Sequence, residues 1–261
     1  GLGVRLKKIE FQVSRYRIQV EMLVPACCLK HESRIKNRLG ERSMSSCCNV
    51  PGTTEPMNKF FSRWSKRYAK RFRKGGLEKT QRYILEGIRK EPVTARRILD
   101  IGCGVGSLHL TLLKEGAATA TGVEISEGMI SQAKKFAEDF HLQDRTNYVV
   151  GDFVREAPSV EEADLTMLDK VVCCYEDYEA LISTSTAKTR AIYALSHPRQ
   201  NILVESVFKL QIFFAKLFRS AFHPFWHDWT AIHRLIVENN FELIYSNSTI
   251  AWQVLVYRRI H

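Results

Sequence analysis

Residues 97–110 have the sequence RILDIGCGVGSLHL, and this stretch decides the fold. An apolar run of strand character ends at Asp100, and a second apolar run, of helical character, begins after Gly106. Between them, Gly102 and Gly104 join Gly106 in a glycine-rich turn. Glycine tolerates a left-handed backbone and lets a ligand approach the main chain closely. The stretch therefore predicts a strand, a ligand-binding turn and a helix.

The spacing of these glycines argues against a dinucleotide cofactor. The dinucleotide turn has the pattern G-x-G-x-x-G, whereas the third glycine here, Gly106, comes one residue early. The carboxylate of Asp100, two residues before Gly102, would repel a pyrophosphate and attract a cation. S-adenosylmethionine carries a sulfonium and an ammonium group and no phosphate, so it is the cofactor that the turn favours.

Two further acidic residues follow the next predicted strands, over 119–126 and 146–154. Glu124, with Ile125 beside it, lies 22 residues after the first glycine, where a carboxylate can accept hydrogen bonds from both ribose hydroxyls. Asp152 is placed to accept from an adenine amino group, and Phe153 to pack on the adenine ring. Either acid alone could simply cap a helix. Because the carboxyl ends of parallel strands share one edge of a sheet, the acids together predict a cofactor crevice.

Strand-like and helical patterns alternate along the rest of the chain, an order typical of an α/β protein built from βαβ units. The patterns predict strands over 96–103, 119–126, 146–154, 164–174 and 191–198, helices over 106–116, 127–140 and 175–188, a long helical region from 201 to about 240 broken near His223 and Pro224, and a terminal antiparallel pair over 241–260.

Residues 97 to about 175 resemble the cofactor half of the class I S-adenosylmethionine-dependent methyltransferases. Asp100, the three glycines, Glu124 and Asp152 carry the resemblance. It implies a Rossmann-like doubly wound sheet of seven strands in the order 3-2-1-4-5-7-6, with the last strand antiparallel. Including LDKVVCCYEDYEAL (168–181) and WQVLVYRR (252–259), the chain is similar to small bacterial-type methyltransferases distantly resembling magnesium-protoporphyrin O-methyltransferases; residues 1–43 lie outside this similarity.

Three residues are candidates for work on the acceptor. Asp169, which we also count with the cofactor residues, ends the fourth strand, where the resemblance places acceptor-facing groups, and Tyr175 follows it. His227 lies in a segment expected to cover the sheet edge and is a candidate base; a capping or packing role is the alternative. The motifs of amino- and cytosine-5-methylating enzymes are absent, and only Asp177 accompanies Asp169, so no metal site is predicted.

Charge is concentrated at the front of the chain. Of the 261 residues, which carry a net charge of +11, residues 1–97 contain 24 Lys or Arg against 8 Asp or Glu, and residues 98–261 contain 15 against 20. We expect a poorly ordered extension and linker over 1–56, basic helices over 57–96 and a methyltransferase domain over 97–261. The aromatic residues at near-helical spacing in the basic helices predict a packing face (Phe60, Phe61, Trp64, Tyr68 and Phe72), with binding to RNA or anionic lipid as the alternative.

The cysteine spacing and the distribution of apolar residues indicate in which cellular compartment the protein is found. The seven cysteines show no C-x-x-C spacing, so neither a disulfide framework nor a zinc site is predicted, and Cys173 and Cys174 fit a small buried hydrophobe. No run of 18 apolar residues and no secretory signal occurs, which predicts a cytoplasmic protein, with organelle targeting by the Arg-rich front as the alternative.

The apolar stretch 201–222 predicts a core helix, with a lid or a membrane-surface contact as alternatives.

These patterns together predict an S-adenosylmethionine-dependent methyltransferase, monomeric or weakly associating, acting on a small apolar or carboxylate-bearing acceptor. The family resemblance implies O-methylation. The alternatives are an RNA or protein methyltransferase that uses the basic front, and a protein that binds the cofactor without turnover.

Overall fold

The computed structural model describes residues 4–13, 16–25, 54–217, 220, 222 and 224–260. The chain forms two compact units, residues 1–50 and residues 51–261. Residues 57–96 therefore belong to the same unit as the sheet that follows them.

The first unit contains an antiparallel pair of strands, β1 (Val4–Val13) and β2 (Tyr16–Pro25). In β2, Ile18, Val20 and Met22 alternate with polar residues at the period of two that a strand requires. Of the extension and linker predicted over 1–56, residues 26–53 lie outside the described residues.

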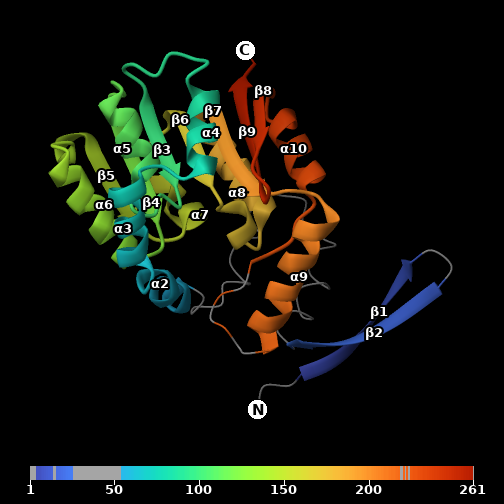
Figure 1. Cartoon of the computed structure of the whole chain (residues 1–261). Helices are drawn as coiled ribbons and strands as arrows, with labels where there is room; N and C mark the ends of the chain where they lie inside the picture. The colour runs from blue at the N-terminus through green and yellow to red at the C-terminus, as the bar shows by residue number, and fades with distance from the viewer. Residues whose placement is uncertain are drawn as a thin grey trace. The chain divides into compact units, whose positions relative to one another are not determined.

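The second unit is built on one sheet of seven strands in the order β5-β4-β3-β6-β7-β9-β8 (Figure 1). The strands are β3 (Arg97–Ile101), β4 (Thr119–Glu124), β5 (Thr146–Val150), β6 (Ala163–Asp169), β7 (Thr189–Pro198), β8 (Phe241–Ser248) and β9 (Trp252–Arg259). Counted from β3, this order is 3-2-1-4-5-7-6, and β9 runs antiparallel to both of its neighbours. The predicted fold class and strand order are confirmed.

Helices cover both faces of this sheet. They are α2 (Thr54–Ser62), α3 (Ser65–Gly75), α4 (Lys79–Ile88), α5 (Ser107–Lys114), α6 (Glu127–Asp139), α7 (Phe153–Glu156), α8 (Tyr178–Ala187), α9 (Ile202–Leu217) and α10 (Trp229–Glu238), with 3-10 turns η2 (Gln143–Arg145), η3 (Ala157–Ser159) and η4 (Val172–Cys174). No helix in the described ranges is long and apolar enough to span a bilayer.

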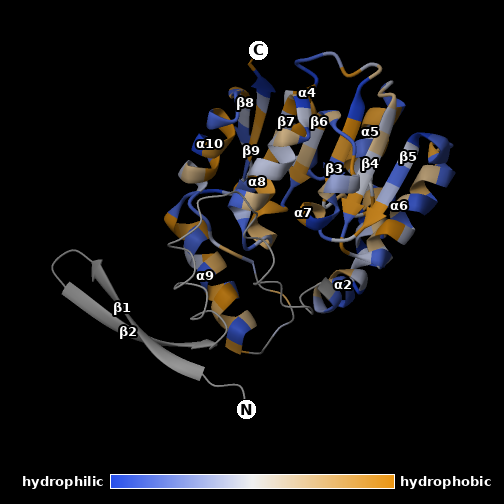
Figure 2. Ribbon diagram, turned by 180° about the vertical axis from the view of Figure 1, so that it is seen from behind, coloured by the Kyte–Doolittle hydropathy of each residue, from blue (hydrophilic) through white to orange (hydrophobic). Residues whose placement is uncertain are grey.

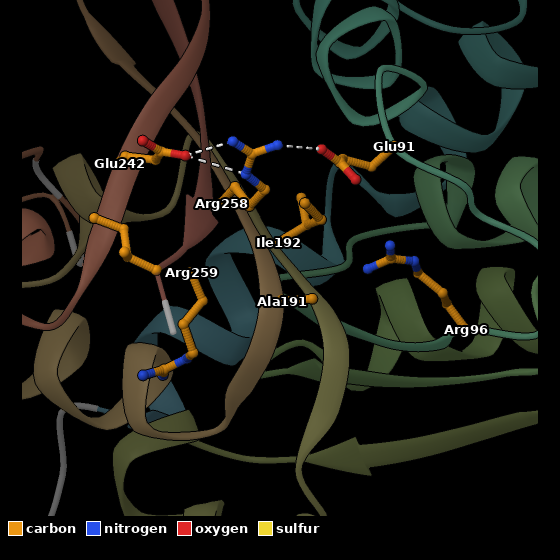
Figure 3. Close-up of a pocket in the computed structure, with 8 residues that line it drawn as sticks. Glu91, Arg96, Ala191, Ile192, Glu242, Arg258 and Arg259 are labelled. Carbon is orange, nitrogen blue, oxygen red and sulfur yellow. Dashed lines mark hydrogen bonds and ion pairs between the residues drawn. The ribbon is translucent and has the colours of Figure 1, made fainter.

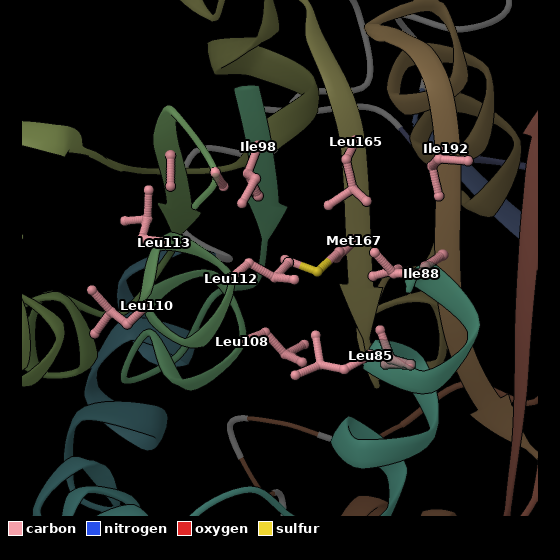
Figure 4. Packing of buried hydrophobic residues seen from close by; sticks show 14 of the residues in the cluster. Leu85, Ile88, Ile98, Leu108, Leu110, Leu112, Leu113, Leu165, Met167 and Ile192 are labelled. Atoms are coloured by element: carbon pink, nitrogen blue, oxygen red, sulfur yellow. The ribbon is translucent and has the colours of Figure 1, made fainter. Parts of the chain in front are cut away.

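Two apolar cores separate these layers. One lies between the sheet and helices α4, α5 and α6, where Leu85 and Ile88 pack near Leu112 and Met167 (Figure 4). The other lies between the sheet and α7, α8 and α10. The central strands β3, β6 and β7 are mostly buried, as expected of parallel strands between two helical layers.

Two predicted strands end earlier than their apolar patterns suggest. The strand predicted to 154 ends at Val150, because the Asp152 carboxylate accepts a hydrogen bond from Val154 N (2.9 Å) and starts α7. The strand predicted to 174 ends at Asp169, because Lys170 has a φ of 61° and the chain turns into η4. The predicted break in the long helical region is confirmed by the separation of α9 from α10.

The basic N-terminal segment packs against α6 through polar contacts as well as aromatic ones. Ser62 Oγ lies 2.9 Å from Ser126 Oγ and accepts from Gly128 N (3.1 Å), which fixes α2 to the start of α6. Of the predicted aromatic packing face, Trp64 and Tyr68 are instead 41% and 43% exposed. Trp64 lies at the break between α2 and α3, and Tyr68 lies in the first turn of α3.

Candidate active site

The glycine turn after β3 adopts the predicted conformation. Gly102, Gly104 and Gly106 all have positive φ, at 64°, 55° and 82°. A side chain at Gly102 would place its Cβ 2.5 Å from Val171 Cγ2, whereas a Cβ at Gly104 would meet nothing within 4 Å. Gly102 is therefore needed for packing, and Gly104 leaves open space beside the main chain.

Glu124 faces this turn from the end of β4. Its Oε2 accepts a hydrogen bond from Gly104 N (2.9 Å), and its Oε1 accepts one from Ser126 N (3.0 Å). The side chain is 8% exposed, and burial raises its pKa although the neighbouring backbone N–H groups act in the opposite direction. Ile125, the adjacent predicted cofactor residue, is half-buried. The carboxylate is thus held by the main chain at the rim of the open space.

Asp100 lies beneath the turn. Its Oδ2 is 2.7 Å from Nδ1 of His109, and Nε2 of His109 is 3.0 Å from the hydroxyl of Tyr148. Asp100 is 2% exposed and His109 is fully buried. The carboxylate expected to attract a cationic ligand is therefore engaged by a neighbouring imidazole. The sequence signal for this partner was a histidine within the apolar run LHLTLL, which was not recognised as a site feature.

Asp152 and Tyr175 come together at the end of β5. The Tyr175 hydroxyl lies 2.9 Å and 3.1 Å from the two carboxylate oxygens of Asp152. Burial and this carboxylate raise the pKa of Tyr175, so its hydroxyl stays protonated and donates. Tyr175 therefore orients Asp152 and is not a base in this arrangement. Phe153 is 4% exposed within the core, which leaves little of its ring for the predicted contact with adenine.

His227 is held against the same segment. Its Nε2 lies 3.1 Å from the carbonyl oxygen of Val172 and 2.9 Å from that of Tyr175. Carbonyl oxygens only accept, so Nε2 carries the proton and donates, and Nδ1 of the neutral ring keeps its lone pair. Burial lowers the pKa of His227, which favours this neutral form.

Asp169 belongs to a network that the sequence did not reveal. Ser196 Oγ donates to Asp169 Oδ1 (2.6 Å), and burial raises the pKa of this carboxyl. The neighbouring Lys170 donates to Glu78 Oε2 (2.5 Å); burial lowers its pKa, but Asp169 and Glu78 outweigh this and the net direction is upward. Glu78 lies far away in the sequence, at the capping box that starts α4 with Gln81.

The structure thus brings the predicted residues to the carboxyl ends of neighbouring strands β4, β3, β5 and β6, along one edge of the sheet (Figure 1). They form three groups: the turn with Glu124, the Asp152, Tyr175 and His227 cluster, and the Asp169 network. Val171, next to the third group, closes against Gly102 of the first.

Two cavities lie elsewhere. One of about 360 Å³ is at the opposite edge of the sheet, where Arg258 pairs with Glu91 (3.0 Å) and Glu242 (2.5 Å) beside Ala191 and Ile192 (Figure 3). A second of about 600 Å³ runs along α3 and is lined by four cations, Arg67, Lys70, Arg71 and Lys74. The first is remote from the glycine turn, so the candidate site is not there.

Comparison with known proteins identifies the class. Residues 98–194 match the family model of a methyltransferase domain. A sterol 24-C-methyltransferase of Gibberella zeae is 33% identical over 75 residues, 29% of this chain and 19% of that protein, and a putative methyltransferase of a Geobacillus species is 52% identical over 44 residues, 17% of each chain. The structure of magnesium protoporphyrin IX methyltransferase from Synechocystis PCC 6803 with bound S-adenosylhomocysteine superposes with a TM-score of 0.61 at 20% identity, covering 80% of this chain and all of that one.

The strand order and the family match over residues 98–194 support a class I S-adenosylmethionine-dependent methyltransferase domain in that part of the chain. The chain spans less than a fifth of the length of the curated sterol methyltransferases that it matches. The resemblance noted from the glycine turn and the three acids is confirmed at the level of this class.

The residues at the turn fit the cofactor of the class. The open space at Gly104 lies beside a buried carboxylate whose two oxygens are already fixed by main-chain donors, and this suits a ligand that presents hydroxyl groups. Glu124 and the turn would hold the cofactor, with Asp152 toward its base. When bound, S-adenosylmethionine supplies a methyl group on a positively charged sulfur.

Proposed function

We propose that this protein transfers a methyl group from S-adenosylmethionine to a small acceptor molecule. The observation that carries the proposal is the position of Glu124, whose carboxylate bridges Gly104 N and Ser126 N at the rim of the open space in the turn. Its oxygens are buried and oriented by these main-chain donors, so hydrogen bonds from ribose hydroxyls to them would be charge-assisted and preorganised.

We further propose O-methylation of an apolar or carboxylate-bearing acceptor. The fold similarity to a magnesium protoporphyrin IX methyltransferase and the local similarity to sterol methyltransferases both support an apolar small molecule. On the acceptor side, the chain offers His227, whose Nε2 donates to the main chain and whose lowered pKa keeps the ring neutral, so that its Nδ1 lone pair is the atom that can accept a proton. Its contribution would be to take the acceptor's proton while the surrounding backbone fixes the ring.

The cofactor part is tested by calorimetric titration of S-adenosylmethionine and S-adenosylhomocysteine into the full chain. Micromolar binding corresponds to about 8 kcal/mol, and loss of the Glu124 contacts in Glu124→Ala should cost about 1.5 to 3 kcal/mol, or about tenfold or more in affinity. Glu127→Ala is the matched control, because this carboxylate is exposed three residues away. Equal affinities of the two variants would contradict the proposed role of Glu124.

The acceptor part is tested by incubation with S-adenosylmethionine labelled in the methyl group and cell extract separated into small-molecule, RNA and protein fractions. We expect label in the small-molecule fraction, on oxygen, and slower labelling with His227→Ala at unchanged S-adenosylhomocysteine affinity. Label in RNA or protein instead would replace the small-molecule proposal. Cofactor binding without label in any fraction would favour a binding protein.

A further inference from the structure

Helix α9 has an inner face that packs and an outer face that does not. On the inner face, Val204 is 7% exposed, and the Phe208 ring lies 5.7 Å from the ring of Trp226 and 6.1 Å from that of Trp252. Positions 204, 208, 212 and 215 fall on this side at helical spacing. These contacts explain how the helix is attached, and they use only part of its apolar surface.

The outer face of α9 is a stripe of large apolar side chains in solvent. Leu203, Val207, Leu210 and Leu217 are spaced at i, i+4, i+7 and i+14, so they lie above one another on one side of the helix. The exposed fractions on this side are 86% for Ile202, 70% for Leu203, 55% for Val207, 55% for Leu210, 58% for Phe213 and 59% for Leu217. Figure 2 shows these apolar segments along α9 where it extends beyond the sheet. Single exposed apolar residues are ordinary, but a continuous stripe of this kind marks an interaction surface.

Helix α9 carries two lysines against one glutamate beside this stripe. Lys209 and Lys216 lie on its flank, and Lys209, whose side chain is 65% exposed, pairs with Glu205 at 2.6 Å. The segment after α9 returns to α2, because the Phe222 ring lies 5.3 Å from Phe60 and 5.0 Å from Phe61. Residues 54–78 of this neighbouring region contain eight Lys or Arg against two Glu, and four of these cations line the cavity along α3.

We propose that the outer face of α9 binds the surface of a bilayer that contains anionic phospholipid. An amphipathic helix with an apolar stripe and flanking lysines lies in the plane of the interface, with its apolar side chains among the acyl chains and its cations near the headgroups. Apart from its phenylalanines the stripe is aliphatic and offers no hydrogen-bonding group to RNA, and the cationic surroundings complement anionic headgroups. A second copy of the chain would bring the same cations against each other, which disfavours it as the occupant.

This surface is at the edge of the sheet that carries the candidate active site. Helix α9 begins four residues after β7 ends at Pro198, and β7 runs parallel to β6, which ends at Asp169. Docking through α9 would therefore hold the carboxyl edge of the sheet near the lipid. The docking does not depend on methyl transfer, so its test is a binding measurement.

The test is cosedimentation of the full chain with vesicles, either of phosphatidylcholine alone or with about one third phosphatidylglycerol. We expect binding to the mixed vesicles that is about tenfold weaker on phosphatidylcholine alone. Leu210→Glu should weaken binding to the mixed vesicles by about tenfold or more, because it places a charge in the apolar stripe. Gln211→Glu is the matched control, since it adds the same charge at the next exposed position, off the stripe, and should weaken binding by about twofold or less.

Circular dichroism and gel filtration accompany each variant. Both positions are exposed, so both variants should fold as the wild type does. The proposal is overturned if the wild type does not sediment with either vesicle, or if Leu210→Glu and Gln211→Glu weaken binding equally. It is also overturned if the wild type is a dimer that ignores vesicles and that Leu210→Glu converts to a monomer, because the stripe is then covered by a second copy.

Discussion

Nδ1 of His109 lies 2.7 Å from Oδ2 of Asp100 beneath the glycine turn, and both side chains are buried. The other nitrogen of the same ring is 3.0 Å from the hydroxyl of Tyr148. Three elements, β3, α5 and β5, are joined by this one ring. The turn that faces the cofactor space is therefore supported from below by a buried polar network, whose members are costly to remove singly.

We expect His109→Gln to lower the free energy of unfolding by about 3 kcal/mol, because it leaves the buried Asp100 carboxylate without its donor. In His109→Asn the amide nitrogen can take the position of Nδ1 and keep that hydrogen bond, so the loss should be only about 1 kcal/mol. Urea denaturation of both variants measures the difference. If the two variants are equally destabilised, the contact with Asp100 does not account for the stability that His109 contributes.

We expect the free energy of unfolding to depend on pH because of the buried His197. Its ring stacks on Trp229 at 4.6 Å, its Nδ1 lies 2.8 Å from the carbonyl oxygen of Pro198, and burial lowers its pKa from 6.5 to about 4. A histidine with a lowered pKa contributes stability that is fully present above pH 6.5 and is lost as the pH falls toward 4, by about 3 kcal/mol in all. His227, with a pKa lowered by burial, acts in the same direction.

His197→Phe should flatten this pH dependence, since phenylalanine keeps the stack on Trp229 and cannot be protonated. Urea denaturation at several pH values between 7.5 and 4.5 measures it, and a part of the slope should persist because of His227. A variant that loses stability as steeply as the wild type would show that His197 is not the group that titrates.

Glu78 links the basic helix α3 to the end of strand β6. Its carboxylate binds Arg71 (3.0 Å) on one side and Lys170 (2.5 Å) on the other, with its side chain 26% exposed. Glu78→Gln should lower the free energy of unfolding by about 1 to 2 kcal/mol, after allowance for the partial exposure of the pair. The rate of amide hydrogen exchange in α3 should rise.

Glu55→Gln is the control: it breaks an exposed pair with Lys59 and should cost about 0.5 kcal/mol or less by denaturation. Equal losses in the two variants would mean that Glu78 makes no special link.

The sequence predicted those features that are set by local patterns. The strand and turn over 97–106 follow from an apolar run and three glycines, and the acids at 124 and 152 follow from strand ends, so their common edge could be derived from topology alone. The strand order came through the family resemblance. The overlong strands over 146–154 and 164–174 show where apolar pattern fails, because Asp152 caps a helix and Lys170 takes a left-handed backbone within apolar runs.

Partners distant in the sequence could not be predicted. Lys170 binds Glu78 across 92 residues, and neither residue type nor spacing reveals that pair. His109 is only nine residues from Asp100 and stands out as a polar residue in an apolar run, but the pattern does not say which group it meets. The outer face of α9 was also mistaken for a core face, since the pattern of an apolar helix does not tell packed from exposed residues. Only the packing of Phe208 on one side identifies the other side as the open one.

Gly102 and Gly104 should respond differently to the same substitution, although both have positive φ. Gly102→Ala pushes its Cβ to 2.5 Å from Val171 Cγ2 and should cost about 3 kcal/mol of folding free energy, from backbone strain and overpacking together.

Gly104→Ala meets open space and should cost only the backbone strain, about 1 to 2 kcal/mol. Its methyl group, however, enters the space assigned to the cofactor, so affinity for S-adenosylhomocysteine should fall by about tenfold. Urea denaturation and calorimetry separate the two effects, and Val171→Ala should recover part of the stability lost in Gly102→Ala but none of the affinity lost in Gly104→Ala. A Gly104→Ala protein that is folded and binds S-adenosylhomocysteine as the wild type does would show that the open space beside Glu124 is not where the cofactor lies.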